Sequence, residues 1–151
     1  MPTDPFVRGL LRRLRLQGKY KRVTPKTCVN KHFNTPFLCM YGYETKLAIL
    51  NDTIRGNARG GIYENIISEC LIKRGYTLYY YKPDSEHEIE FLIEKDGEVI
   101  PVEVKAGNNP TPSLNSYIED FSPSYAYKLI GGRNGTIGAK ITLPHYFVMF
   151  I

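Results

Sequence analysis

The stretch "IEFLIEKDGEVIPVEVKAG", residues 89–107, predicts a β-hairpin. Two runs rich in Ile, Val and Phe meet at Asp96-Gly97, a dipeptide that strongly favours a two-residue hairpin turn. If this turn sets the register, Glu90 lies directly opposite Glu103. Like charges in that arrangement destabilise a strand pair. The predicted pairing therefore raises the question of what compensates the repulsion between the two opposed carboxylates.

The two faces of this hairpin differ in their chemistry. The face expected to be core carries Ile89, Phe91, Ile93, Ile100, Val102 and Val104. The other face brings Glu90, Glu103 and Lys105 together at one end of the hairpin, with Glu88 opposite Lys105. A hard divalent cation such as Mg²⁺ takes oxygen ligands and often only one or two carboxylates, so a metal between Glu90 and Glu103 would replace repulsion with coordination.

A simpler alternative explains the same acidic residues. In it the hairpin faces solvent, the two carboxylates splay apart, and Glu88 with Lys105 forms a weak surface pair. The two readings differ in one titration property. If Glu90 and Glu103 lie close together without a cation, one of the two carboxyls has a raised pKa.

Composition places the chain in a broad class. Its 151 residues, 42% hydrophobic and 23% charged, predict one globular domain. Cys28, Cys39 and Cys70 are an odd number without regular spacing, which argues against a disulfide framework and favours a reducing compartment. No apolar run reaches transmembrane length, and residues 1–22 lack the apolar centre of a secretory signal. We therefore expect a cytoplasmic protein without a membrane partner.

Positive charge gathers at the amino end. The formal net charge is +5, and residues 1–31 carry nine Lys and Arg against Asp4 alone, so residues 32–151 sum to −3. Four apolar residues at helical spacing predict a basic amphipathic helix there: Val7, Leu10, Leu11 and Leu14. Such a helix could contact nucleic-acid phosphates, or its Leu stripe could dock on the rest of the protein or on a neighbour.

Periodicity predicts the other elements. We expect helices at residues 47–50, 62–74 and 113–121, strands at residues 76–82, 125–132 and 145–151, and turns at residues 131–140. In the helix at 62–74, Glu64 lies at the border of the apolar face, three residues before Ile67. If this helix packs on the sheet, Glu64 can reach the hairpin as a third carboxylate.

These residues resemble a known superfamily. Gly60/Gly61-x-x-Glu64 on a helix, the strand "EIEF" and the strand "PVEVK" are similar to the PD-(D/E)XK, or restriction-endonuclease-like, nucleases. Residues 32–151 more narrowly resemble the domain of unknown function that follows AAA+ ATPase modules, in "GGIYENIISECLIKRGYTLYYYK", "EIEFLIEKDGEVIPVEVKAG" and "SLNSYIEDFSPSYAYKLIGG". The resemblance implies a single α/β domain with a central mixed β-sheet flanked by helices.

The same resemblance assigns roles to four residues. It makes Glu64 the helix carboxylate, Glu90 the first strand acid, Glu103 the second, and Lys105 the lysine that positions or activates water. Glu90 and Glu103 would hold Mg²⁺ or Mn²⁺. The basic segment, residues 1–31, would be the remnant of a linker.

The chain departs from the family pattern in three places. Position 90 is Glu where the family usually has Asp, and Tyr41, Gly42 and Tyr43 stand where related domains carry an Asp-x-Gly-Leu-like stretch. No G-x-x-x-x-G-K-[ST] motif occurs, so the ATPase part is absent and we expect a detached or shortened carboxy-terminal piece.

Two classes of function follow from these residues. The first is a metal-dependent phosphodiesterase or nuclease acting on nucleic acid. The second is a non-catalytic module that binds nucleic acid or a partner AAA+ ATPase. Weaker signals are a zinc set of Cys28, His32 and Cys39, which fits no ordinary finger spacing, and the single histidines His87 and His145, expected as turn and surface residues.

Overall fold

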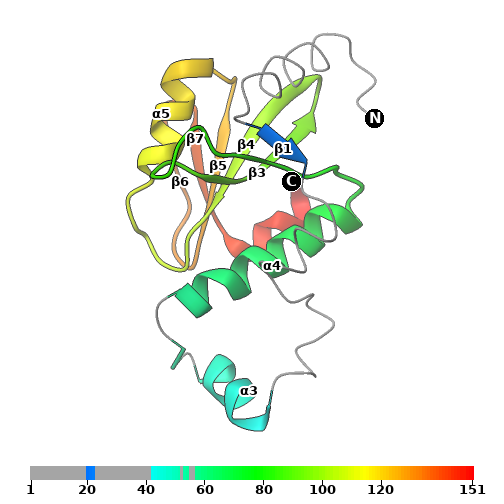
Figure 1. The fold of residues 1–151 in the computed structure, drawn as a ribbon, viewed down its shortest axis with the longest axis vertical. Helices are drawn as coiled ribbons and strands as arrows, with labels where there is room; N and C mark the ends of the chain where they lie inside the picture. The colour runs from blue at the N-terminus through cyan, green and yellow to red at the C-terminus, as the bar shows by residue number, and fades with distance from the viewer. Residues whose placement is uncertain (1–19, 23–41, 52, 55–56) are drawn as a thin grey trace.

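A single mixed sheet with helices on both faces forms the core of the domain (Figure 1). The computed structural model describes residues 20–22, 42–51, 53–54 and 57–151. In these residues the helices are α3 (Tyr43–Leu50), α4 (Asn57–Lys73), α5 (Pro112–Phe121) and the 3₁₀ helix η2 (His145–Phe150). The strands are β1 (Tyr20–Arg22), β2 (Tyr79–Tyr81), β3 (Ile89–Lys95), β4 (Glu98–Val104), β5 (Ala126–Ile130), β6 (Gly135–Ile137) and β7 (Lys140–Pro144).

The sheet is mixed in direction. Its strand order is β1-β2-β3-β4-β5-β7-β6. The pairs from β1 to β4 are antiparallel, β4 with β5 and β5 with β7 are parallel, and β6 returns antiparallel to β7. The α5 crossover between β4 and β5 makes the first parallel pair possible. The predicted α/β fold, with a central mixed sheet flanked by helices, is confirmed.

Each face of the sheet buries its own hydrophobic cluster. The α5 side contains Tyr79, Tyr81, Ile89, Leu92, Val99, Leu114, Tyr117 and Ala126. The α4 side contains Ile67, Leu71, Leu78, Phe91, Ile93, Ile100, Val102, Val104, Tyr127, Leu129, Val148 and Ile151. In Figure 1, α5 and α4 cover opposite sides of the strands, whereas α3 lies apart from the sheet. The hairpin is therefore enclosed on both faces, although only one was expected to be core.

The hairpin forms with the predicted register. Asp96 and Gly97 both have positive φ, 53° and 80°, as the two central residues of a type I′ turn require. Phe91 pairs with Val102, and Lys95 with Glu98. Extending this antiparallel register by one residue places Glu90 opposite Glu103, which confirms the prediction.

Two predictions near the carboxyl end are wrong. Residues 145–151, expected as an apolar strand, form η2, in which Val148 is buried while Met149 and Phe150 are exposed. Residues 131–140, expected as turns, contain β6 and the start of β7, joined through Gly138 with a positive φ of 57°. The β7 strand is held by pairing with β5, a long-range contact that local periodicity does not report.

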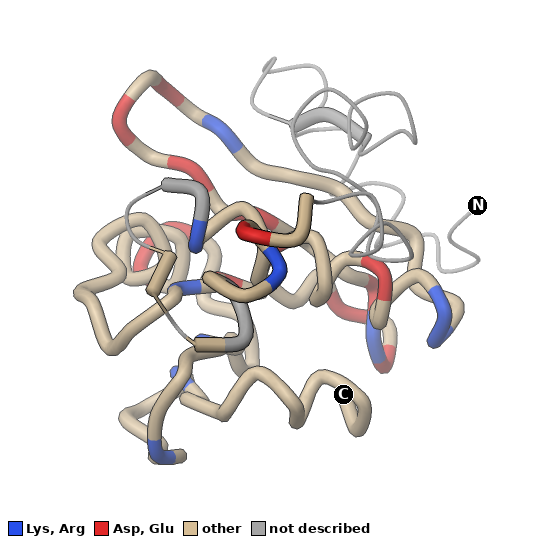
Figure 2. Tube along the Cα trace, turned by 90° about the horizontal axis from the view of Figure 1, so that it is seen from below, with Lys and Arg blue, Asp and Glu red and all other residues tan. Residues whose placement is uncertain are grey.

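Several amino-terminal predictions lie outside the described residues. These are the helix carrying the Leu stripe, the set of Cys28, His32 and Cys39, and the departure at Tyr41. Tyr20–Arg22, in the segment assigned to a linker, pairs with β2 at the edge of the sheet. Over the described trace, basic and acidic positions are interspersed (Figure 2). Among the described helices, each one is too short or too polar to cross a bilayer.

Candidate functional site

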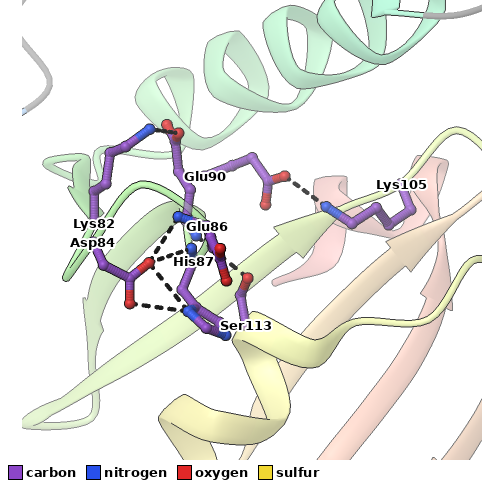
Figure 3. A network of polar contacts seen from close by, with 8 residues as sticks. Lys82, Asp84, Glu86, His87, Glu90, Lys105 and Ser113 are labelled. Atoms are coloured by element: carbon purple, nitrogen blue, oxygen red, sulfur yellow. Dashed lines mark hydrogen bonds and ion pairs between the residues drawn. The ribbon is translucent and has the colours of Figure 1, made fainter.

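Three charged side chains meet where β3 begins and β4 ends. The Lys105 Nζ lies 2.6 Å from Glu103 Oε1 and 2.9 Å from Glu90 Oε1. Glu90 reaches across the hairpin toward Lys105 (Figure 3). We call Glu90, Glu103 and Lys105 the acid–lysine cluster. The cation between the opposed carboxylates is thus the ammonium group of the chain's own lysine.

The two carboxylates of the cluster differ in burial. Glu103 is 1% exposed, and Val99 on the same face of β4 belongs to the cluster under α5. Burial, and then the charge of Glu90, raise the pKa of Glu103 to about 8, although Lys105 acts in the opposite direction. The direction agrees with the raised carboxyl pKa that the sequence predicted, although burial is a larger cause than the charge of Glu90.

The ammonium group of Lys105 is held in its charged form. Burial alone would lower its pKa, but the charges of Glu90 and Glu103 and the hydrogen bonds to both outweigh burial and raise the pKa above its ordinary value. This ammonium therefore stays charged across the physiological range. It neutralises the more exposed carboxylate, Glu90, while Glu103 shares the same ammonium.

The second oxygens of the two carboxyls have different surroundings. Glu90 Oε2 accepts a hydrogen bond from the Val104 backbone N–H at 3.2 Å. Glu103 Oε2 is buried and has no hydrogen-bond partner in the described structure. A buried oxygen without a partner costs free energy, so this atom is a position where a cation or a donor from a ligand would be favourable.

The alternative of a solvent-facing hairpin is wrong. Lys105 pairs with Glu90 and Glu103, whereas Glu88 forms its ion pair with Lys82 at 2.8 Å. The Glu88 backbone N–H also donates to Ser113 Oγ at 3.3 Å, at the start of α5. The hydrogen bond to Ser113 links the residue before β3 to the start of α5.

The two histidines behave differently. His87 follows the bend at residues 83–86 and contacts Asp84, whose pKa is lowered by hydrogen bonds from His87 and Glu86 (Figure 3). This agrees with its expected place in a turn. His145, expected at the surface, is half-buried: its Nε2 donates to the Lys105 carbonyl oxygen at 2.9 Å.

The backbone of Lys105 is held from two sides. Its N–H donates to the Leu129 carbonyl at 2.9 Å, and its carbonyl accepts from His145. The His145 ring stacks on Tyr63 of α4, with ring centroids 4.1 Å apart. Burial lowers the pKa of His145, so the imidazole is neutral near pH 7. Sequence reasoning missed this contact because 40 residues separate His145 from Lys105.

Glu64 is carried by the helix on the other face of the sheet. α4 packs Ile67 and Leu71 into the cluster that contains Val102 and Val104, so strand alternation turns Glu103, which lies between these two valines, to the opposite face. Within the residues that the structure describes, no three His, Cys, Asp or Glu side chains gather as a metal-binding group. Glu64 therefore does not complete a three-ligand site with the two strand carboxylates.

The donor set nevertheless suits a metal with few protein ligands. Glu90 and Glu103 supply carboxylate oxygens, the type that Mg²⁺ and Mn²⁺ prefer, and Mg²⁺ is often bound by only one or two carboxylates. The unpartnered Glu103 Oε2 is the observation that fits a cation. Glu90 and Glu103 are the residues that could hold such an ion.

Comparison with known proteins gives one family match. The model of a family described as "Domain of unknown function (DUF4143)" matches residues 59–136, the part of the chain that contains α4, the hairpin, α5 and β5. No curated protein and no solved structure matches the chain. All three residues of the acid–lysine cluster lie inside the matched range.

Proposed function

This chain belongs to the family of the domain of unknown function DUF4143, and we propose that its acid–lysine cluster is the site of a metal-dependent phosphodiesterase acting on nucleic acid. One observation carries the proposal: a lysine is held between two opposed carboxylates, one of which is buried with an unpartnered oxygen. Perturbed, clustered titratable groups of this kind are frequent at catalytic sites.

Each residue of the cluster has a role that follows from its position. Glu90 and Glu103 would hold Mg²⁺ or Mn²⁺, an ion that supplies charge stabilisation at a phosphoryl oxygen and acidifies a bound water. Lys105, fixed at its backbone by Leu129 and His145, orients the attacking water and neutralises charge that develops on the phosphate. Glu64, on the opposite-face helix, keeps only its predicted assisting role.

The glutamate at position 90 sets an expectation for the rate. The resembled superfamily usually has the shorter Asp at this position, and Glu90 here also hydrogen-bonds the Val104 N–H. The longer side chain shifts the ligand oxygen, so we expect slow turnover. Glu90→Asp should increase it.

A second function is favoured by a different observation. The acid–lysine cluster is already neutralised by Lys105, and the described residues offer no third ligand. A domain of this kind can keep its fold and bind without turnover. Under this alternative the chain is a cytoplasmic binding module for nucleic acid or for an AAA+ ATPase.

A cleavage assay with four variants tests the proposal. Purified protein is incubated with single- and double-stranded DNA and RNA in Mg²⁺, Mn²⁺ or EDTA. Lys105→Met should abolish cleavage while Mg²⁺ affinity stays the same or rises, because a nearby positive charge is gone. Glu103→Gln should remove both cleavage and Mg²⁺ binding. The controls are Glu119→Gln on α5 and Lys73→Met on α4, two side chains exposed to solvent.

The outcomes separate the two functions. Metal-dependent cleavage that both cluster variants lose and both controls retain supports the phosphodiesterase. Calorimetric titration of Mg²⁺ and Mn²⁺ into wild type and Glu103→Gln measures the ion site independently of turnover. If no nucleic acid is cleaved, and Glu90→Asp does not produce cleavage either, the enzyme proposal is refuted and the binding module stands.

A further inference from the structure

A row of polar side chains crosses the sheet beside the acid–lysine cluster. In the parallel registers Glu103 pairs with Lys128 of β5, and Lys128 with Thr142 of β7. Ala126 belongs to the hydrophobic cluster under α5, so Lys128, two residues on, faces the same side. Lys140, the partner of Ala126, faces this side as well. Lys128 thus lies next to Glu103, and Lys140 lies on the same face one strand further along the sheet.

Lys128 is a buried lysine whose ammonium group donates to a neutral amide. It is 7% exposed, and its Nζ donates to Asn108 Oδ1 at 2.9 Å. Among the described residues no carboxylate lies within ion-pair distance of this Nζ. Burial, and then the charge of Lys140, lower its pKa, and of the nearby groups only Glu103 acts in the opposite direction. A neutral amide compensates a buried ammonium incompletely.

Lys140, like Lys128, donates a hydrogen bond from its ammonium group to the side-chain amide of an asparagine, here Asn115 on α5. Its Nζ donates to Asn115 Oδ1 at 2.9 Å, so each of the two lysines is held by the amide oxygen of an exposed asparagine. An ammonium group has three N–H donors, and two positive charges on one face repel each other unless an anion lies between them. The face therefore offers a position for an anion directly beside the position assigned to a cation.

We propose that Lys128 and Lys140 form a phosphate-binding site with Asn108 and Asn115 at its rim. This site binds a backbone phosphate of the nucleic acid, next to the phosphate at the acid–lysine cluster. The assignment rests on the proposed function for the identity of the ligand as a phosphodiester strand. Lysine binds phosphate as a compact point charge, without the geometric demands of a bidentate contact. Such a contact positions the strand and carries no sequence information.

Binding in EDTA tests this site without any turnover. Fluorescence anisotropy measures the affinity of the full chain for labelled single- and double-stranded DNA and RNA over a range of salt concentrations. Lys128→Met and Lys140→Met should each weaken binding by about tenfold, and the slope of log K against log salt should become shallower by about one phosphate contact, roughly 0.7–0.9. Lys73→Met removes the same charge from an exposed position on α4 and should change the slope little.

Circular dichroism identifies any variant that fails to fold. If Lys128→Met is unfolded, the affinity and salt slope of Lys140→Met alone test the site. Affinities and salt slopes equal to those of Lys73→Met would overturn the site. Binding of inorganic pyrophosphate but of no oligonucleotide would overturn the nucleic-acid assignment, as would wild type that binds no oligonucleotide. If the lysine effects appear and cleavage does not, this site stands and only the phosphodiesterase falls.

Discussion

At the scale of the residue, the buried carboxyl of Glu103 is the decisive feature of the site. Two carboxylates on neighbouring strands repel each other, and a single ammonium cannot fully neutralise both in a buried position. The Lys105 ammonium pairs with both carboxyls, and burial of Glu103 raises the pKa of that group. Burial thus distinguishes two side chains of identical chemistry.

This difference predicts how stability depends on pH. The pKa of Glu103 is about 8 in the folded chain and near its ordinary value of 4.5 in the unfolded one. Between these values the folded state binds the extra proton, so the contribution of Glu103 to stability is complete below 4.5 and is lost as pH rises through about 8. The free energy of unfolding, measured by urea titration, should therefore fall with pH relative to Glu103→Gln, by at most about 1.4 kcal/mol per pH unit.

Groups that titrate in the same way in wild type and in Glu103→Gln do not contribute to the difference between their unfolding free energies. His145 is one of them: its lowered pKa makes it stabilising above its ordinary value and less so as pH falls. A constant difference between wild type and Glu103→Gln from pH 5 to 8 would contradict the raised pKa of Glu103.

At the scale of the element, the two hairpin strands and η2 show when local sequence is sufficient. The hairpin combines a turn of defined chirality with alternating side chains, and both act within a few residues. η2 has an apolar sequence that suits either a strand or a short helix. Its burial pattern, Val148 and Ile151 inside with Phe150 outside, has the three-residue period of a 3₁₀ helix.

Substitutions in η2 should report this period. Val148→Ala should lower the free energy of unfolding by about 1–3 kcal/mol, because Val148 is 2% exposed in the α4-side cluster. Phe150→Ala, at a side chain 75% exposed, should change it by less than about 0.5 kcal/mol. In a strand these two side chains would share a face, so similar losses in urea unfolding of the two variants would contradict the helix.

The hairpin turn gives a matched test of backbone conformation. Gly97→Ala should cost about 1–2 kcal/mol, because φ of 80° places an L residue in the left-handed region. Gly42→Ala is the control, since a Cβ there meets no atom within 4 Å. Chemical denaturation of both variants measures the difference, and an equal effect at the two positions would count against a positive φ at residue 97.

At the scale of the whole molecule, the domain is a sheet covered by helices on both faces. α4 and η2 cover one face, α5 covers the other, and in the described part of the chain both hydrophobic clusters are built from residues 67–151 (Figure 1). β1 adds a three-residue strand at one edge. The amino-terminal charge of +8 is therefore separate in sequence from the part of the chain that supplies the core.

Deletion of residues 1–20 tests this separation. We expect the shortened chain to unfold cooperatively, with a denaturant m value reduced only in proportion to the residues removed, because the deletion takes one residue from β1 and none from either cluster. Circular dichroism during urea titration provides the measurement. A gradual, non-cooperative transition would show that the amino end is required for the fold.

Local sequence was sufficient to predict most of α4, although this helix begins at Asn57 rather than at residue 62. It was also sufficient to predict the hairpin, its register and the meeting of Glu90 with Glu103 and Lys105. These features depend on a turn dipeptide and on side-chain alternation, which act between near neighbours in the chain. The sequence also indicated a raised pKa for one carboxyl from the closeness of two like charges, whereas in the fold burial is the larger cause of the shift.

Tertiary packing sets which of the two carboxyls is buried. It also brings His145 to the Lys105 carbonyl and Lys128 beside Glu103. These two contacts join residues that are 40 and 25 positions apart in the sequence. Sequence periodicity describes how an element folds on itself, whereas the partner of each face is chosen by the packing of the whole sheet.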